Sequence, residues 1–442
     1  MGKVKIGLIC VSLQGERTDL AQDFLRRARE TISQTEIELF CADEVTLDGQ
    51  QVKDQQKAIE AAGADAIIYM CGTWLLSTHI VDAAKETKLP IAVWGLPEPI
   101  SFSSVGCNAV HGTLDEMGIA HKLLHGMPED EKVKREICAF AKAAWVRRKL
   151  ACARMGIIGG RAICAYPTAA DPNQVKAVFG TEVEHIDQLL VLEKARGVPD
   201  EKAKKWMEET LPRYGKVEAK EETLLKSAKI YFALKEIAEE HELNMLSIKC
   251  IGEFLDAYAS CCLPLSVLND EGLTVQCQCN INALLSGYIM NLLSGGPSYF
   301  GDINTVDERE GIARLINCGS IPGKLAQSHK DIHVVEQYDY MGLGGGACTL
   351  FCMKEGRVTF GTLGRVEGQY VMSIAGGEAF VQPKEVLTPV RSWAQGFVKL
   401  DCDPVVFYRN IRCNHSVVAY GDYREELKEI CRQSGIFALE NE

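Results

Sequence analysis

Short apolar runs alternate with helix-length segments over the first 150 residues of the chain. The runs VKIGLICVSL, TEIELFC, DAIIYMC and LPIAVWG are separated by segments of helical character, one from about Asp19 to Ser33 and two near Gln55 and Ile80. Strands and helices that alternate at this spacing predict a parallel sheet with helices on both faces. We therefore expect a doubly wound α/β domain over residues 1–150.

The alternation continues and then gives way to a β-rich pattern. Residues 151–300 contain the strand patterns MGIIGGRAI and TEVEHID and two charged helices, and predict a second α/β domain. Residues 301–442 contain Gly-punctuated runs such as GRVTFGTLGRVEGQYVMSIAGGEAFV. That pattern predicts an antiparallel sheet or barrel, closed by a short helix from about Tyr423 to Gln433. The expected fold class is α/β, with two doubly wound parallel-sheet domains followed by a β-rich, barrel-like domain.

Composition excludes several classes of partner. A formal net charge of -12 argues against nucleic acid and anionic membrane, because both require clustered Lys and Arg. No apolar run approaches the roughly 18 residues that span a bilayer, and the opening VKIGLICVSL is typical of a strand rather than a signal peptide. The 18 cysteines are scattered through apolar runs, which predicts buried thiols in a reducing cytoplasm.

Residues 248–282 contain the sequence pattern that points most clearly to a functional site. The pattern predicts strand, helix, strand, helix, and places Glu253 and Asn280 just past the carboxyl ends of two strands. Ligands bind at that edge of open α/β sheets, so two oxygen ligands there can meet at a single ion. A distant histidine, His415, adds a nitrogen ligand.

Loops that follow other strand patterns carry aromatic and basic residues. Arg17 and Trp74 lie in the first domain, and Gly159-Gly160-Arg161 follows the first strand of the second. The ring of Trp74 is suited to the C–H face of a sugar, and Arg161 to an anion near backbone amides. The structural alternatives are that Trp74 is a buried packing residue and that the glycines form an ordinary tight turn. No GxGxxG or GxxxxGK[ST] occurs there, which counts against a nicotinamide dehydrogenase.

Collinear stretches along nearly the whole chain resemble the L-fucose isomerase and L-arabinose isomerase-like family. They are GTWLL at 72–76, LPIAVWGLPEP at 89–99, MGIIGGR at 155–161 followed by FGTEVEHID, the segment 248–282, GRVTFGTLGR at 356–365, YVMSIAGGEA at 370–379, and CNHSVVAYGDYREEL at 413–427. The resemblance implies two α/β domains, a β-barrel domain and an aldose–ketose isomerase, which is an intramolecular oxidoreductase. It also implies a trimer or hexamer whose active sites lie at subunit contacts, where Trp74 serves a neighbouring subunit.

The same resemblance implies a metal site. In the family, two acidic residues and one histidine bind a divalent ion, usually manganese, which chelates O1 and O2 of an open-chain aldose while a proton moves between C1 and C2 through an enediol. By position, the metal ligands are Glu253, Asn280 and His415. Glu253 and Asn280 are the expected catalytic residues, with Glu253 as the base. Asn414 and Gln278 are expected to contact the sugar.

Two departures from the family pattern alter this expectation. Where the family shows Cys-Glu-x-Asp, residues 277–280 read Cys-Gln-Cys-Asn, and where many relatives show His-Cys-Gly, residues 317–319 read Asn-Cys-Gly. An amide oxygen coordinates a hard cation but does not accept a proton at neutral pH. The site therefore retains at most one obvious general base.

Two interpretations follow from these departures. In the favoured one, a working isomerase has lost carboxylates that would repel an anionic sugar by about 1 kcal/mol or more each. A sulfonated hexose such as sulfoquinovose, or a phosphorylated or uronic sugar, then pairs with Arg17 or Arg161. In the alternative, the protein is a catalytically altered sugar-binding or regulatory homologue. A periplasmic-type sugar receptor fits less well, because it needs a signal peptide and no β-rich third part.

The three expected ligands also have structural interpretations. Glu253 in the first turn of a helix favours the helix dipole, and His415 is otherwise a satisfied histidine near a strand end. Asn280 is equally suited to be the N-cap of the helix INALLSGYIM. A cap residue also lies at the ligand-binding edge, so this role is compatible with the functional one.

Overall fold

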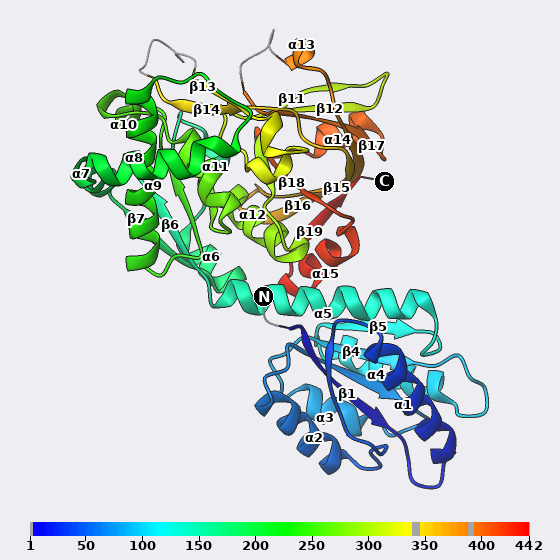
Figure 1. The fold of residues 1–442 in the computed structure, drawn as a ribbon. Coiled ribbons are helices and arrows are strands. Elements are labelled where there is room, and N and C mark those ends of the chain that lie inside the picture. The colour runs from blue at the N-terminus through cyan, green and yellow to red at the C-terminus, as the bar shows by residue number, and fades with distance from the viewer. Residues whose placement is uncertain (1–2, 338–344, 388–392, 442) are drawn as a thin grey trace. The chain divides into compact units, whose positions relative to one another are not determined.

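The computed structural model describes residues 3–337, 345–387 and 393–441. The chain divides into two compact units. Unit 1 comprises residues 1–149 and 425–434, and unit 2 comprises residues 150–424 and 435–442. Both units contain a parallel sheet flanked by helices, and unit 2 adds a large, mainly antiparallel sheet. The predicted fold class is therefore confirmed, and the second α/β segment and the β-rich segment form one unit (Figure 1).

Unit 1 is built on a five-stranded parallel sheet of order β2-β1-β3-β4-β5. Its strands are β1 (Lys5–Val11), β2 (Glu38–Cys41), β3 (Ala66–Cys71), β4 (Ile91–Gly95) and β5 (His121–His125). Its helices are α1 (Thr18–Ser33), α2 (Gly49–Ala61), α3 (Thr78–Ala84), α4 (Ser103–Glu116), α5 (Glu131–Ala151) and α15 (Arg424–Ser434).

Helices cover both faces of this sheet, as the alternating pattern predicts. One core joins Leu8 and Trp94 of the sheet to Phe24 of α1 and Phe140 of α5. The opposite core joins Ile9 and Tyr69 to residues of α2, α3 and α4. Because successive strand residues face opposite sides, a parallel strand covered on both faces must be apolar at nearly every position, which explains runs such as IIYMC.

The C-terminal helix α15 belongs to unit 1 although it follows the β-rich segment in sequence. It pairs with unit 1 through Lys142 Nζ, 3.6 Å from Glu426 Oε1, and Gln433 Nε2, which donates to the Phe140 carbonyl at 3.1 Å. The helix therefore occurs where the sequence predicts it, but it packs against α5 and β5 rather than closing the β-rich part.

The parallel sheet of unit 2 has the order β10-β9-β6-β7. Its strands are β6 (Arg154–Ile158), β7 (Glu182–Ile186), β9 (Met245–Ile248) and β10 (Thr274–Cys277). The helices around it are α6 (Pro172–Phe179), α7 (Gln188–Gly197), α8 (Asp200–Thr210), α9 (Glu221–Glu240), α10 (Glu253–Ala257), α11 (Cys262–Asp270) and α12 (Ile281–Ser294).

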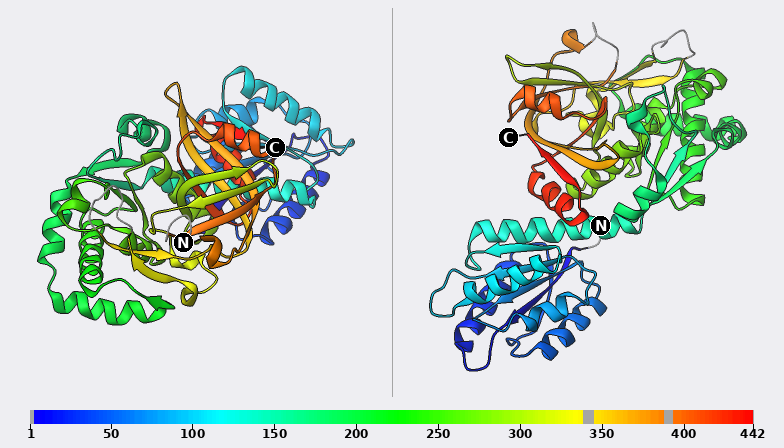
Figure 2. Two further views of the ribbon diagram at one scale, coloured as in Figure 1. Left: turned by 90° about the horizontal axis from the view of Figure 1, so that it is seen from above. Right: turned by 180° about the vertical axis from the view of Figure 1, so that it is seen from behind.

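The large sheet of unit 2 has the order β15-β18-β11-β12-β17-β16-β19, and β15 also pairs with β16, so that six strands form a closed ring (Figure 2). Its strands are β11 (Tyr299–Asp307), β12 (Ile312–Ile316), β15 (Gly356–Val366), β16 (Gln369–Phe380), β17 (Gln395–Leu400), β18 (His415–Tyr420) and β19 (Phe437–Glu440). All pairs are antiparallel except β16 with β19. A ring leaves few unpaired strand edges.

Smaller elements complete unit 2. A three-stranded sheet joins β8 (Lys216–Val217), β13 (His333–Glu336) and β14 (Ala347–Leu350), and short helices are α13 (Lys384–Leu387) and α14 (Pro404–Asn410). No helix in the described part of the chain is long and apolar enough to cross a membrane.

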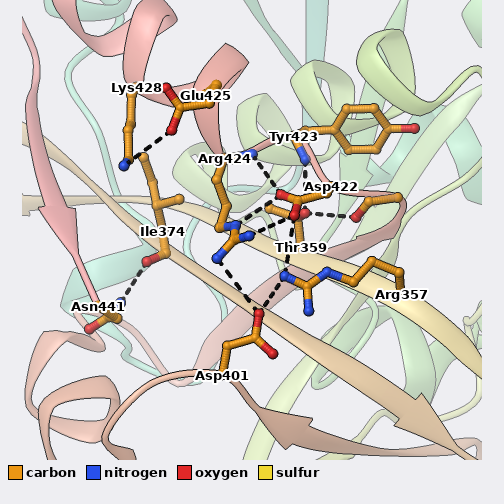
Figure 3. A network of polar contacts seen from close by, with 11 residues as sticks. Arg357, Thr359, Ile374, Asp401, Asp422, Tyr423, Arg424, Glu425, Lys428 and Asn441 are labelled. Atoms are coloured by element: carbon orange, nitrogen blue, oxygen red, sulfur yellow. Dashed lines mark hydrogen bonds and ion pairs between the residues drawn. The ribbon is translucent and has the colours of Figure 1, made fainter. Parts of the chain in front are cut away.

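An ion-pair network ties three strand ends of the ring together (Figure 3). Arg357 of β15 pairs with Asp401 after β17 and with Asp422 after β18, the latter at 3.2 Å. Arg424 pairs with the same two carboxylates, at 3.6 Å and 2.7 Å. The network fixes the turn that leads from β18 towards the C-terminal helix.

Candidate active site

The strand β10 ends in a strained turn that leads into α12. Gln278 and Cys279 both have left-handed backbone angles, with φ of 70° and 49°, which costs free energy in residues other than glycine. The turn is held by the Gln278 amide, which donates to the Ile248 carbonyl at 2.8 Å. Strain of this kind is typical of functional sites, where the surrounding structure enforces it.

Asn280 follows this turn as the N-cap of α12. Its Oδ1 accepts a hydrogen bond from the Ala283 amide at 3.0 Å, and its side chain is completely buried. Because the backbone N–H can only donate, the oxygen must face Ala283, and the NH2 group faces the other way. There Nδ2 lies 3.0 Å from Nδ1 of His415.

This contact sets the tautomer of His415. An amide NH2 group only donates, so Nδ1 of His415 must accept, and the proton of the neutral imidazole resides on Nε2. The side chain is 1% exposed. Burial lowers the pKa of His415 below its ordinary value, and the opposing effects of Asp302 and Cys277 are smaller. At neutral pH the ring is therefore neutral and carries its N–H on Nε2.

Asp302 lies directly opposite His415 in the antiparallel pair of β11 and β18. Its Oδ1 is 3.8 Å from Nε2 of His415 and accepts a hydrogen bond from Nδ2 of Asn414 at 2.7 Å. Loss of solvation raises the pKa of Asp302, while His415 and Asn414 partly offset this effect. A carboxyl with a raised pKa beside an imidazole is suited to acid–base chemistry.

These groups line one pocket of about 240 Å³ within unit 2. Its lining residues are Ile163, Cys250, Ile251, Leu255, Ser260, Cys262, Gln278, Asp302, Asn317, Cys318, Gln337, Trp393, Asn414 and His415. Oε1 of Gln278 is buried without a hydrogen-bond partner among the residues the structure describes, as expected of a group that awaits a polar ligand.

Thiols are concentrated at this pocket. Cys250, Cys262 and Cys318 line it, and Sγ of Cys318 lies 3.7 Å from Sγ of Cys277. Most of the 18 cysteines are buried. Buried thiols are what the scattering of cysteines through apolar runs predicts.

The structure brings together four of the residues singled out from the sequence, namely Gln278, Asn280, Asn414 and His415. Glu253 is separate from them. It is the first residue of α10, its side chain is 73% exposed, and its carboxylate pairs with Lys249 Nζ at 2.8 Å. It is not among the pocket residues, although Ile251 and Leu255 are. Its position matches the alternative interpretation, in which an acidic residue in the first turn favours the helix dipole.

The three residues proposed from loops are not among the residues that line the pocket. Arg17 and Trp74 belong to unit 1, where Arg17 Nε donates to Asp19 Oδ1 at 2.7 Å and Trp74 is 36% exposed. Arg161 is exposed and its guanidinium stacks 4.2 Å from the ring centre of Tyr166. The glycines before it have φ of 93° and 86°, so the tight-turn interpretation describes them.

The predicted ligand set of Glu253, Asn280 and His415 does not fit a divalent ion in this structure. The Asn280 oxygen is used by the helix cap, and its NH2 group, which cannot bind a cation, faces the imidazole. The other imidazole nitrogen carries a proton, so it has no free lone pair. The carboxylate of Glu253 pairs with Lys249. A divalent ion at these three residues stays a prediction of the family resemblance, and the donor atoms present do not support it.

Asp302 was not predicted from the sequence. It follows Tyr299-Phe300-Gly301 in a buried strand start, and an acidic residue there is a weak signal. Its importance depends on pairing with a residue more than 100 positions away, which only the strand register reveals.

Comparisons with known proteins agree with this architecture. Residues 315–439 match the model of the L-fucose isomerase C-terminal domain. A sulfoquinovose isomerase of Alkalicoccus urumqiensis is 24% identical over 399 residues, 86% of each chain. Sulfoquinovose isomerases of Clostridium sp. (strain MSTE9) and Priestia aryabhattai are 25% and 20% identical, covering 76% and 75% of this chain and 77% and 78% of theirs.

One solved structure among the matches is a periplasmic solute-binding protein from Actinobacillus succinogenes with bound D-allose. It covers 66% of this chain and 92% of its own, with 10% identity and a TM-score of 0.19, which is too low to support any inference.

The match to the L-fucose isomerase C-terminal domain and the similarity to several sulfoquinovose isomerases identify the protein as an aldose–ketose isomerase. Residues 315–439 match the L-fucose isomerase C-terminal domain, and the chain as a whole is similar to the fucose isomerase-like family.

Proposed function

We propose that the protein interconverts an open-chain sulfonated hexose and its ketose through an enediol, with Asp302 as the base and neutral His415 as the electrophile. The observation that carries this proposal is the cross-strand pair of Asp302 and His415, in which Asn280 directs the imidazole proton to Nε2. The substrate class is suggested by the relatives, which are named sulfoquinovose isomerases.

The proton transfers balance without another reactant. The Asp302 carboxylate accepts the proton from C2 of the aldose, while the Nε2–H of His415 donates a hydrogen bond to the carbonyl oxygen on C1. The electron pair of the broken C–H bond forms the enediol double bond. Asp302 then returns the proton to C1. His415 gives its Nε2 proton to O1 and takes the proton of the O2 hydroxyl, so O2 becomes the ketone oxygen and the neutral imidazole is restored. A neutral imidazole with a lowered pKa beside a carboxylate base also serves enediol chemistry on another fold.

The pocket lining is suited to a sugar that carries a negative charge. Gln278 is neutral where the family has a carboxylate, so this position adds no negative charge to the pocket. Arg161 lies on the loop that contributes Ile163 to the pocket, and no carboxylate in the described part of the chain pairs with it. We assign Arg161 to the sulfonate.

Arg161→Ala should therefore weaken binding of sulfonated and phosphorylated aldoses at least tenfold and spare neutral aldoses. The reason is the loss of a charge-assisted hydrogen bond to the anion. Steady-state KM values for both classes of sugar check this. Arg196→Ala, which removes another Arg of unit 2, is the matched control. Equal losses for charged and neutral sugars would remove Arg161 from the substrate site.

The test of the proposed function is proton exchange at C2, measured by NMR in deuterated water with sulfoquinovose, glucose 6-phosphate and glucose. We expect deuterium incorporation and ketose formation with the sulfonated sugar, in the presence or absence of manganese. Binding of the sugar without exchange would contradict the proposal and support the alternative of a sugar-binding or regulatory homologue.

Removal of metal tests the departure from the metal-dependent family mechanism. We expect protein dialysed against EDTA to keep its isomerase activity within about twofold, because the donor atoms of Glu253, Asn280 and His415 are engaged elsewhere. Metal content by mass spectrometry and activity are measured on the same sample. An activity that falls and is restored tenfold or more by Mn2+ would show that the family's metal is used.

We further propose that the protein acts as a homo-oligomer in the cytoplasm. Trp74, Ile100 and Phe102 are 36%, 58% and 55% exposed on neighbouring loops of unit 1, and the Trp74 amide donates to the Ser101 carbonyl at 2.9 Å. Apolar surface of this kind is typical of subunit contacts. Light scattering gives the subunit number, and a monomer would contradict the proposal.

A further inference from the structure

Two histidines and an aspartate converge at the end of α4 in unit 1. His111 and Asp115 are four residues apart on α4, so they share one face of the helix, and His121 is the first residue of β5. One donor atom from each lies within 4.8 Å of the other two. Within the described residues, this is the one cluster of His, Cys, Asp and Glu side chains that converges so closely.

The imidazole of His121 is fixed in the orientation of a metal ligand. Its Nδ1 lies 2.8 Å from the Ile119 carbonyl, and its side chain is 3% exposed. A carbonyl only accepts, so Nδ1 carries the proton and Nε2 has a free lone pair. That lone pair accepts a hydrogen bond from Nδ1 of His111 at 2.7 Å, so an ion that binds both nitrogens replaces this bond and His111 then carries its proton on Nε2. A backbone carbonyl on the far nitrogen is the usual support of a histidine that binds a metal.

Asp115 completes the arrangement from the helix. Its Oδ1 is 4.0 Å from Nε2 of His121, and its Oδ2 is 3.5 Å from Nε2 of His111. Asp115 is 63% exposed and His111 is 34% exposed, so one side of the cluster is open to water. The three donors therefore surround a point that solvent can reach, with positions left for water ligands.

We propose that His111, Asp115 and His121 form a binding site for a divalent transition-metal ion such as Zn2+, Co2+ or Ni2+. Two imidazoles and one carboxylate suit these ions, whereas Mg2+ and Ca2+ prefer oxygen donors. An ion bound at about 2.0–2.1 Å from each nitrogen requires the two rings to move apart by a few tenths of an ångström. The site would tie the end of α4 to β5, the edge strand of the sheet.

The site is independent of the proposed isomerase chemistry. None of its three residues lines the pocket that contains Asp302 and His415. Binding of an ion would stabilise unit 1, because an ion that binds the folded state alone raises the free energy of unfolding in proportion to the logarithm of its concentration.

Titration of metal-free full-length protein with Co2+ tests the proposal, because the visible spectrum of Co2+ reports its ligands. We expect one Co2+ ion to bind per chain, with a spectrum that lacks thiolate-to-metal charge-transfer bands. The absence of these bands distinguishes this site from a site formed by cysteines. His111→Gln and Asp115→Ala should each weaken the binding of this Co2+ ion by at least about tenfold. Both residues are partly exposed, so the variants are expected to fold.

His125→Ala is the matched control, since His125 is an exposed histidine on the same strand outside the cluster. The His125→Ala variant should bind one Co2+ ion with the same spectrum as the wild type. The proposal would be overturned if both His111→Gln and Asp115→Ala bound Co2+ as tightly as the wild type, or if the spectrum showed thiolate bands. Isomerase activity of His111→Gln after EDTA treatment shows separately whether the isomerase pocket needs metal.

Discussion

Asp302→Asn is expected to lower kcat by roughly 10²–10⁴-fold, because the amide cannot accept the proton from C2 of the sugar. The substitution keeps the size of the side chain, and its oxygen still accepts the hydrogen bond from Asn414. KM should therefore change little. Steady-state kinetics and C2 exchange measured on the same preparation check the result.

The same variant should be more resistant to heat at neutral pH. The folded-state pKa of Asp302 is raised, so the folded protein disfavours the carboxylate. Its destabilising effect is absent below the unfolded pKa of about 3.9 and is complete above the folded pKa. Melting curves of the wild type and Asp302→Asn should diverge as the pH rises through that window. Asp307→Asn, at the far end of the same strand, is the control, because its pKa is lowered and the variant should not gain stability.

Opposite changes in activity and stability would identify Asp302 as a group kept for chemistry at the expense of folding. A variant with wild-type kcat would remove Asp302 from the mechanism. A variant with lower activity and lower melting temperature would instead assign Asp302 a structural role.

Asn280→Asp is expected to reverse the tautomer of His415. One carboxylate oxygen can still cap α12 through the Ala283 amide, but the other accepts a hydrogen bond where the NH2 group of Asn280 donates one. The imidazole proton then moves to Nδ1, and Nε2 can no longer donate to the sugar carbonyl. Activity without metal should fall by at least roughly 10²-fold.

The variant should also gain affinity for Mn2+. Its Nε2 lone pair is free and lies 3.8 Å from Asp302 in the wild-type structure, so a cation can contact both donors and the new carboxylate adds negative charge. Nitrogen-15 NMR of His415 reports the tautomer, and electron paramagnetic resonance reports bound Mn2+. Asn280→Ser, which keeps a capping hydroxyl without a carboxylate, is the control. A wild-type protein with the proton on Nδ1 would contradict the assigned role of Asn280.

Local patterns predicted much of the fold. The expected helix from Asp19 to Ser33 is observed as Thr18–Ser33, and the apolar runs of the first domain correspond to β1, β2, β3 and β4. These elements depend on periodicity within a few residues, which the sequence displays. The parallel pairing of β19 with β16 and the docking of α15 on unit 1 depend on contacts between distant segments, which periodicity does not record.

The sequence predicted which residues meet at the site, but not how their side chains are oriented. Asn280 and His415 were placed at one site, and the structure confirms that they touch. The N-cap role of Asn280, open as an alternative from the sequence, is observed. The Ala283 N–H fixes which way the side-chain amide of Asn280 faces. The exposed side chain of Glu253 forms an ion pair with Lys249 instead of entering the pocket. Side-chain orientation therefore changed the expected chemistry although the residues were found.

The membership of α15 in unit 1 also has a consequence for synthesis on the ribosome. The parallel sheet of unit 1 lies within residues 5–125, yet residues 425–434 emerge from the ribosome only after most of unit 2. Until then the surface of α5 that receives Gln433 lacks its partner. Synthesis of unit 1 thus starts before that of unit 2 and is completed after most of it, so nascent chains hold an incomplete unit 1 while the β-rich segment is made.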